Sequence, residues 1–151
     1  MGGVIQLGKG TIKTYSKGQA VIALSSGEAE YYGLVSGISN GLGEQSLLAD
    51  WDIAVNLQVW MDATAGIAIG RRRGLGRVKH VDVAFLWVQE IVNRGRAQVG
   101  KKHTKEMLAD MFTKALSESD MCRHMESMGY RFVEGRSKLG FQTCDPQVSI
   151  L

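Results

Sequence analysis

Residues 25–34, Ser-Ser-Gly-Glu-Ala-Glu-Tyr-Tyr-Gly-Leu, constrain the fold most strongly because they fix where a long helix begins. Ser25 and Glu28 have the spacing of a capping box, in which each side chain bonds a backbone N–H group that the first helical turn leaves unpaired. Apolar residues then recur at helical spacing, at Leu34, Val35, Ile38 and Leu42. The pattern predicts a helix from Ser25 to about residue 48 with one buried face.

The rest of the chain alternates short apolar segments with amphipathic ones. The strands that we expect cover residues 4–7, 11–15, 19–24, 57–61 and 96–100. The further helices that we expect cover residues 64–69, 81–93 and 104–115, with one or two more turns within 117–128. An antiparallel opening followed by β-α units predicts an α/β fold, with a mixed sheet flanked by helices.

Composition excludes several classes of protein. No apolar run approaches the ~20 residues of a membrane span, and the N-terminus lacks the basic-then-apolar order of a secretory signal. The two cysteines, Cys122 and Cys144, do not form the Cys-x-x-Cys pair of a zinc site. We therefore expect an intracellular chain with free thiols and no membrane contact.

The net charge of +3 is compatible with a polyanionic partner. Basic residues gather in two places, Lys101, Lys102 and Lys105 in one, and Arg71, Arg72, Arg73, Arg77 and Lys79 in the other. The second group follows a candidate active-site carboxylate closely. Contact with nucleic-acid phosphates and a solvated loop are equally good interpretations of it.

Two acidic residues occupy sequence positions that would suit a cation ligand. Glu30 heads the helical row that continues with Leu34 and Ile38, and it lies about 200° around the helix from Glu28. A metal ion would compensate a carboxylate on that apolar row; the alternative is a half-exposed glutamate stabilised by the helix N-terminus. Asp62 follows the strand at 57–61, where ligand sites of α/β sheets collect, but it could equally cap the next helix.

Three other residues have stronger structural interpretations from spacing alone. Asp110 can form an i, i+4 ion pair with Lys114, although it also lies beside an apolar stripe. His103, seven residues earlier, is a candidate proton carrier, but a solvated loop histidine has the same pattern. Trp60 is expected in the core rather than at a base-stacking surface.

Four ordered blocks resemble the ribonuclease H domain that ends the polyprotein of copia-type LTR retrotransposons. Residues 24–31 are similar to its Leu-Ser-Ser-Thr-Glu-Ala-Glu-Tyr, and residues 108–114 are similar to its Leu-Ala-Asp-Ile-Phe-Thr-Lys. Residues 79–82 resemble its Lys-His-Ile-Asp, and residues 15–19 resemble its Trp-Ser-Ser-Lys-Lys-Gln, one residue shorter here. The blocks keep their order and spacing across about residues 3–116. We therefore take residues 1–116 as one domain and residues 117–151 as a C-terminal helix and irregular tail.

The resemblance implies a ribonuclease-H-like fold and a Mg²⁺- or Mn²⁺-dependent endonuclease that cuts the RNA strand of RNA–DNA hybrids during reverse transcription. It implies catalytic and metal-ligating roles for Glu30, Asp62 and Asp110, and a looser catalytic match for His103. The implied partners are the hybrid, contacted by the group at residues 71–79, and the reverse transcriptase portion of the same polyprotein. It implies no particular oligomeric state.

The chain departs from the family at its N-terminus. In the family, a central strand with a fourth carboxylate precedes the segment where this chain begins, whereas residues 1–27 contain no Asp or Glu. The resemblance therefore implies a sheet with a gap and a metal site that lacks one ligand. The alternative function is a catalytically incomplete remnant that binds nucleic acid, or a fragment of a longer polyprotein.

Overall fold

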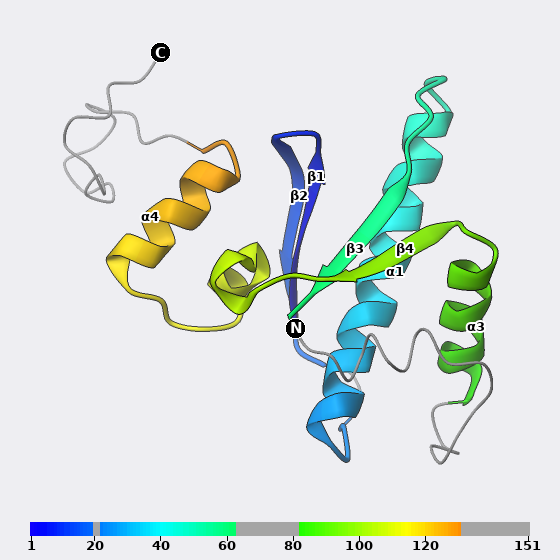
Figure 1. Ribbon diagram of the computed structural model, residues 1–151, viewed down its shortest axis with the longest axis horizontal. Helices are drawn as coiled ribbons and strands as arrows, with labels where there is room; N and C mark the ends of the chain where they lie inside the picture. Colours follow the sequence, from blue (N-terminus) through cyan, green and yellow to red (C-terminus); the bar gives the residue numbers. More distant parts are fainter. Residues whose placement is uncertain (20–21, 63–81, 131–151) are drawn as a thin grey trace. The chain divides into compact units, whose positions relative to one another are not determined.

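Residues 1–19, 22–62 and 82–130 are described by the computed structural model of the chain (Figure 1). The chain forms two units, one from Met1–Lys17 with Leu108–Leu151 and the other from Gly18–Met107. We call these unit 1 and unit 2. The expected domain boundary near residue 116 stays a prediction.

Unit 1 is built on an antiparallel hairpin of β1 (Gly2–Leu7) and β2 (Gly10–Ser16). Gly8 has a positive φ of 60°, which the tight turn between the strands requires and which glycine adopts without strain. Two short helices complete the unit, η2 (Leu108–Phe112) and α4 (Glu118–Ser127). The Ser16 hydroxyl donates to the Phe112 carbonyl at 2.8 Å, so β2 is tied to η2.

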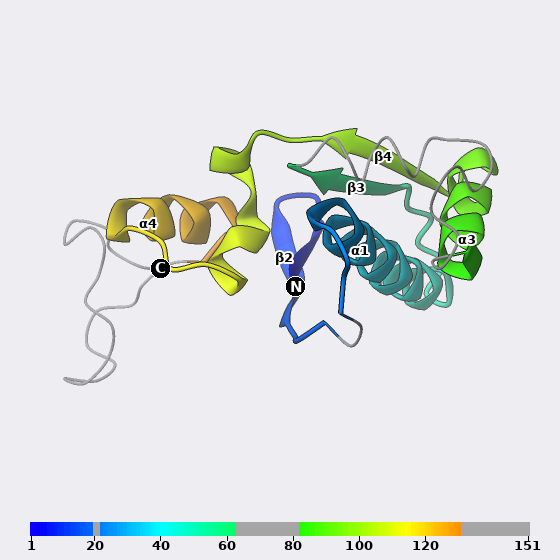
Figure 2. The ribbon, with the colours of Figure 1, turned by 90° about the horizontal axis from the view of Figure 1, so that it is seen from below.

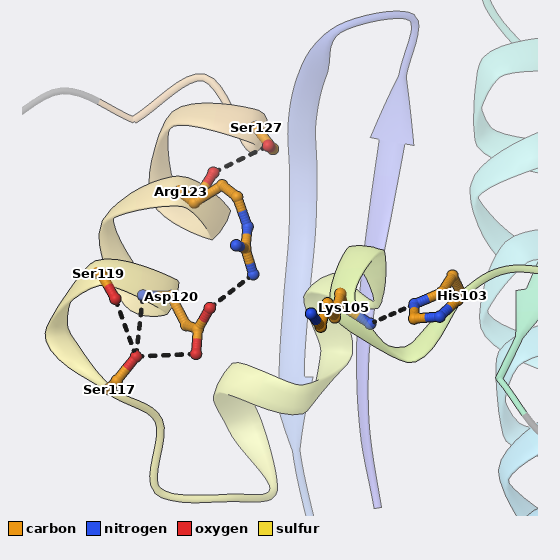
Figure 3. Close-up of polar contacts among 7 residues, drawn as sticks. All are labelled: His103, Lys105, Ser117, Ser119, Asp120, Arg123 and Ser127. Carbon is orange, nitrogen blue, oxygen red and sulfur yellow. Dashed lines mark hydrogen bonds and ion pairs between the residues drawn. The ribbon is translucent and has the colours of Figure 1, made fainter.

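The first turn of α4 is stabilised by a side-chain network (Figure 3). Ser117 Oγ accepts a hydrogen bond from Asp120 N at 3.2 Å and donates one to Asp120 Oδ2 at 2.8 Å. Arg123 Nη2 lies 2.7 Å from Asp120 Oδ1. The hydrogen bond from Ser117 lowers the pKa of Asp120, and the charge of Arg123 adds to the effect.

Unit 2 places two helices on one face of a parallel strand pair (Figure 2). Its elements are α1 (Ser26–Ala49), β3 (Leu57–Met61), α3 (Asp82–Asn93), β4 (Ala97–Lys101) and η1 (Thr104–Glu106). Its core is formed by Tyr31, Leu34, Ile38, Val88, Ile91, Ala97 and Val99. The Tyr31 hydroxyl donates to the Ala84 carbonyl at 2.9 Å, so α1 is joined to α3.

Most elements agree with the sequence, and two do not. Residues 22–24 form no strand, because none of the described strands pairs with them, and Ile22 and Leu24 are 89% and 76% exposed. The single helix expected at 104–115 is two short 3₁₀ helices, since Met107 takes an extended conformation between them. The helix expected at 64–69 lies outside the described residues.

The α/β class is confirmed, and its sheet is in two pieces. Within the described ranges, β1 pairs with β2 and β3 pairs with β4, and no hydrogen-bonded strand joins the two pairs. This is compatible with a ribonuclease-H-like α/β fold. None of the described helices has the length and apolar character needed to span a membrane. Cys122 is disulfide-bonded, so the expectation of a free thiol there is wrong.

Candidate metal centre

The first turn of α1 gives its two glutamates different environments. Ser25 Oγ accepts from Glu28 N at 3.2 Å, which confirms half of the expected capping box. The Glu28 carboxylate accepts from the backbone N–H of Leu24 at 2.8 Å, one residue earlier than the usual capping-box contact, and from the Tyr32 hydroxyl at 3.2 Å. Glu28 is thus occupied in holding the helix N-terminus.

Glu30 has a buried oxygen without a hydrogen-bond partner among the residues that the structure describes. Leu34 and Ile38, which continue its row along α1, are 1% and 0% exposed, as the helical spacing predicts. Glu30 Oε2 is buried and has no hydrogen-bond partner. A buried carboxylate oxygen without a partner is unfavourable, and a bound cation would compensate it. The donor chemistry of this position therefore fits a divalent metal ion.

The packing of α1 on β3 determines which residues of the strand lie opposite each turn of the helix. A Cβ placed on Gly41 would lie 2.5 Å from Leu57 Cδ1, and one placed on Gly37 would lie 3.6 Å from Val59 Cγ1. Four helical residues advance about 6 Å, as do two strand residues, at about 6.6 Å. Moving four residues toward the N-terminus of α1 therefore covers about the same distance as moving two residues toward the carboxyl end of β3.

Extending this register places two candidate ligands at one end of unit 2. Gly33 falls level with Met61, and Glu30 lies about 4.5 Å further along the helix axis. Asp62 lies about 3.3 Å beyond Met61 along the strand direction, so it is level with Glu30 along the axis. Figure 1 shows α1 beginning at the end toward which β3 points. Strand alternation continued from Trp60 would put Asp62 on the face of β3 away from α1, but Asp62 lies in a bend, where the alternation ends.

Asp110 belongs to unit 1. Lys114 Nζ lies 3.0 Å from Asp110 Oδ1, which confirms the i, i+4 ion pair, and the Asp110 side chain is 14% exposed. Its carbonyl accepts from the backbone N–H groups of Thr113 and Lys114, so η2 fixes its position. The convergence of Asp110 with Glu30 and Asp62 stays a prediction.

His103 lies at the start of η1, and the orientation of its ring is fixed. His103 Nδ1 accepts from the backbone N–H of Lys105 at 3.2 Å (Figure 3). Because a backbone amide only donates, the neutral imidazole carries its proton on Nε2. Any proton exchange by His103 would therefore use Nε2.

The remaining site predictions have mixed outcomes. The expected phosphate-binding residues Arg71, Arg72, Arg73, Arg77 and Lys79 lie outside the described part of the chain. Among the residues that are described, no group of three or more His, Cys, Asp or Glu side chains is arranged to hold a metal ion. The expectation that Trp60 is a core residue is wrong, because its side chain is 51% exposed. In the sequence, Trp60 alternates with the apolar residues Leu57 and Val59 of the same strand, which predicts that its side chain lies on the face of the strand opposite to theirs.

Comparison with known proteins finds a similarity to a retrotransposon polyprotein. The chain is 28% identical over 123 residues to the retrovirus-related Pol polyprotein from transposon TNT 1-94 of Nicotiana tabacum. The match covers 79% of this chain and 9% of that polyprotein, so the chain spans less than a tenth of the relative's length. No family model matches the chain, and no solved structure matches it. The similarity supports a retrotransposon Pol-derived chain.

Proposed function

We propose that this chain is a metal-dependent endonuclease of the ribonuclease H type that cuts the RNA strand of RNA–DNA hybrids during retrotransposon reverse transcription. The observation that carries the proposal is the buried Oε2 of Glu30, which has no hydrogen-bond partner among the described residues. The similarity to a retrotransposon Pol polyprotein supports it independently. The proposed partners are the hybrid and the reverse transcriptase portion of the same polyprotein.

Each residue of the proposed site has a distinct task. Glu30, Asp62 and Asp110 would ligate Mg²⁺ or Mn²⁺ through carboxylate oxygens, which these ions prefer. A bound pair of ions supplies an activated water and stabilises the leaving oxygen. His103 would exchange a proton at Nε2. The basic residues at 71–79 would contact phosphates, and the shape and 2′-hydroxyl groups of the hybrid would determine substrate choice.

One observation favours a second candidate function. No group of three metal-binding side chains is found in the described segments. A remnant that binds nucleic acid without cutting it, or a fragment of a longer polyprotein, is consistent with this observation.

Cleavage of a labelled RNA–DNA hybrid in Mg²⁺ tests the proposal. We expect the full chain to cut the RNA strand, and Asp62→Asn and Glu30→Gln to abolish cutting, because each removes a ligand charge. Asp50→Asn, at the other end of α1, is the matched control and should cut normally. Mg²⁺ should also raise the Tm of the unaltered chain but not that of Glu30→Gln. Hybrid binding without cleavage and without a Mg²⁺-dependent Tm shift would favour the remnant.

A further inference from the structure

The face of the β3–β4 pair opposite α1 exposes a tryptophan between polar residues. The parallel register aligns Gln58 with Gln98 and Trp60 with Gly100. Gln58, Trp60 and Gln98 are exposed, whereas Ala97 and Val99 on the other face are 2% and 6% exposed. Figure 2 shows α1 and α3 on that other face. We call Gln58, Trp60, Gln98, Gly100 and Lys102 the outer face.

Gly100 allows the indole ring to lie against the sheet. A Cβ placed on Gly100 would lie 2.5 Å from Trp60 Cζ3, 2.8 Å from Cε3 and 3.3 Å from Cη2. Any other residue at position 100 would therefore push the ring away. With one side of the ring against β4 and half of the side chain exposed, Trp60 presents aromatic surface to solvent in a defined orientation.

Positive charge follows directly on β4. Lys102 N donates to the Met61 carbonyl at 2.8 Å, which extends the strand pairing by one residue. By strand alternation Lys102 lies on the same side as Gln98 and Gly100. The parallel register continued by one residue sets Asp62 beside Lys102, and Lys102 is half-buried. An anionic group bound beyond Trp60 would meet the ammonium group of Lys102 next to that carboxylate.

The polar neighbours of Trp60 indicate what the outer face binds. An apolar helix packed there would bury the Gln58 and Gln98 amides without partners, which is costly. A nucleobase instead offers a flat π surface for the indole and edge groups that hydrogen-bond to amides, and its phosphate suits Lys102. We propose that the outer face binds single-stranded nucleic acid by stacking a base on Trp60. This binding does not depend on hydrolysis.

Binding of fluorescein-labelled oligo-dT of twelve nucleotides to the full chain in EDTA tests the proposal, with fluorescence anisotropy as the readout. EDTA prevents any metal-dependent reaction, so failure of the nuclease proposal leaves this result unaffected. Trp60→Ala should weaken binding by about 5- to 100-fold, the range for loss of one base stack. Trp60→Phe should retain most of the affinity, because it keeps an aromatic face.

Trp51→Ala is the matched control, since Trp51 is 66% exposed in the same unit but lies beyond the C-terminus of α1. It should bind oligo-dT like the unaltered chain. Lys102→Gln should reduce the slope of log K against log salt concentration by about 0.7, which corresponds to one phosphate contact on a single strand. Far-ultraviolet circular dichroism should show that all variants fold.

Three results would overturn the proposal. The first is unchanged affinity in Trp60→Ala. The second is an equal loss of affinity in Trp60→Ala and Trp51→Ala, which would indicate a general loss of structure. The third is unchanged oligo-dT binding together with a smaller sedimentation coefficient for Trp60→Ala than for the unaltered chain. That result would make the outer face a contact between copies of the chain.

Discussion

Glu28 and Glu30 lie two residues apart on α1, and their carboxylates meet opposite conditions. Glu28 is 7% exposed, and its oxygens accept hydrogen bonds from Leu24 N and the Tyr32 hydroxyl. The Oε2 atom of Glu30 is also buried, but nothing in the described part of the chain donates to it. The first arrangement stabilises the fold, whereas the second costs stability and is typical of a functional position.

Substitutions at these two positions should change stability in opposite directions. Without metal, Glu30→Leu should raise the free energy of unfolding by roughly 1 kcal/mol, because it removes an unsatisfied buried oxygen and extends the apolar row of Leu34 and Ile38. Glu28→Gln should lower it by about 1–3 kcal/mol, because it weakens the hydrogen bonds at the helix start. Urea unfolding in EDTA measures both.

The matched measurement in Mg²⁺ separates function from packing. The metal should stabilise the unaltered chain and Glu28→Gln, but not Glu30→Leu, since only Glu30 is proposed as a ligand. A destabilised Glu30→Leu in EDTA would show that the carboxylate has a structural partner, and it would remove the main support for the metal centre.

At the scale of elements, α1 packs closely on β3 because glycines lie at the contact. Gly41 lies so close to Leu57 that a Cβ there would overlap its side chain, and Gly37 allows ordinary contact with Val59. Gly43 points elsewhere, and a Cβ placed on it would meet no atom within 4 Å. The three glycines therefore have different roles, although all weaken helix propensity equally.

Alanine substitutions test this register, on which the level of Glu30 and Asp62 depends. Gly41→Ala should lower the free energy of unfolding by about 1–3 kcal/mol, because the added methyl group overpacks against Leu57. Gly43→Ala should raise it by about 0.5–1 kcal/mol, because alanine favours the helix and costs no space there. Thermal and urea unfolding give both values. Equal stabilisation by the two substitutions would show that α1 does not contact β3 at Gly41.

Elements with strong local signals were predictable from sequence. The bounds of α1 and α3 were predicted to within a few residues. The signals were the capping serine and the apolar row of α1, and the glycine with positive φ after α3. The strand predicted at residues 22–24 was wrong because an apolar run forms a strand only when a neighbouring strand pairs with it, and the local sequence does not show that neighbour. The single helix predicted at residues 104–115 was wrong because Met107 adopts an extended backbone within a helical apolar pattern.

The candidate site was predictable to a different extent. Helix geometry separated Glu30 from Glu28, and the contacts of Glu28 are consistent with that choice. The ion pair of Asp110 with Lys114 followed from i, i+4 spacing. The unpartnered oxygen of Glu30 and the position of Trp60 over Gly100 depend on residues far apart in sequence, so only the structure reveals them.

At the scale of the whole molecule, the three proposed metal ligands are widely spaced in the sequence. Glu30 and Asp62 belong to unit 2, and Asp110 belongs to unit 1 with the β1–β2 hairpin. An ion that binds the folded chain stabilises the folded state. The Mg²⁺ affinity of the full chain therefore measures whether each carboxylate contributes to binding.

A double-mutant cycle on Mg²⁺ binding by the full chain tests whether Asp110 and Glu30 bind the same ion. Asp110→Asn and Glu30→Gln should each weaken Mg²⁺ binding about tenfold or more, measured by titration calorimetry. The double variant should bind little more weakly than either single variant, because residues that act together are not additive. Lys114→Gln is the control, since it removes the ion pair and keeps the carboxylate, and it should bind Mg²⁺ at least as tightly as the unaltered chain. Unchanged affinity in Asp110→Asn, or strictly additive losses, would show that Asp110 does not share an ion with Glu30, and Asp110 would then be removed from the proposed ligands.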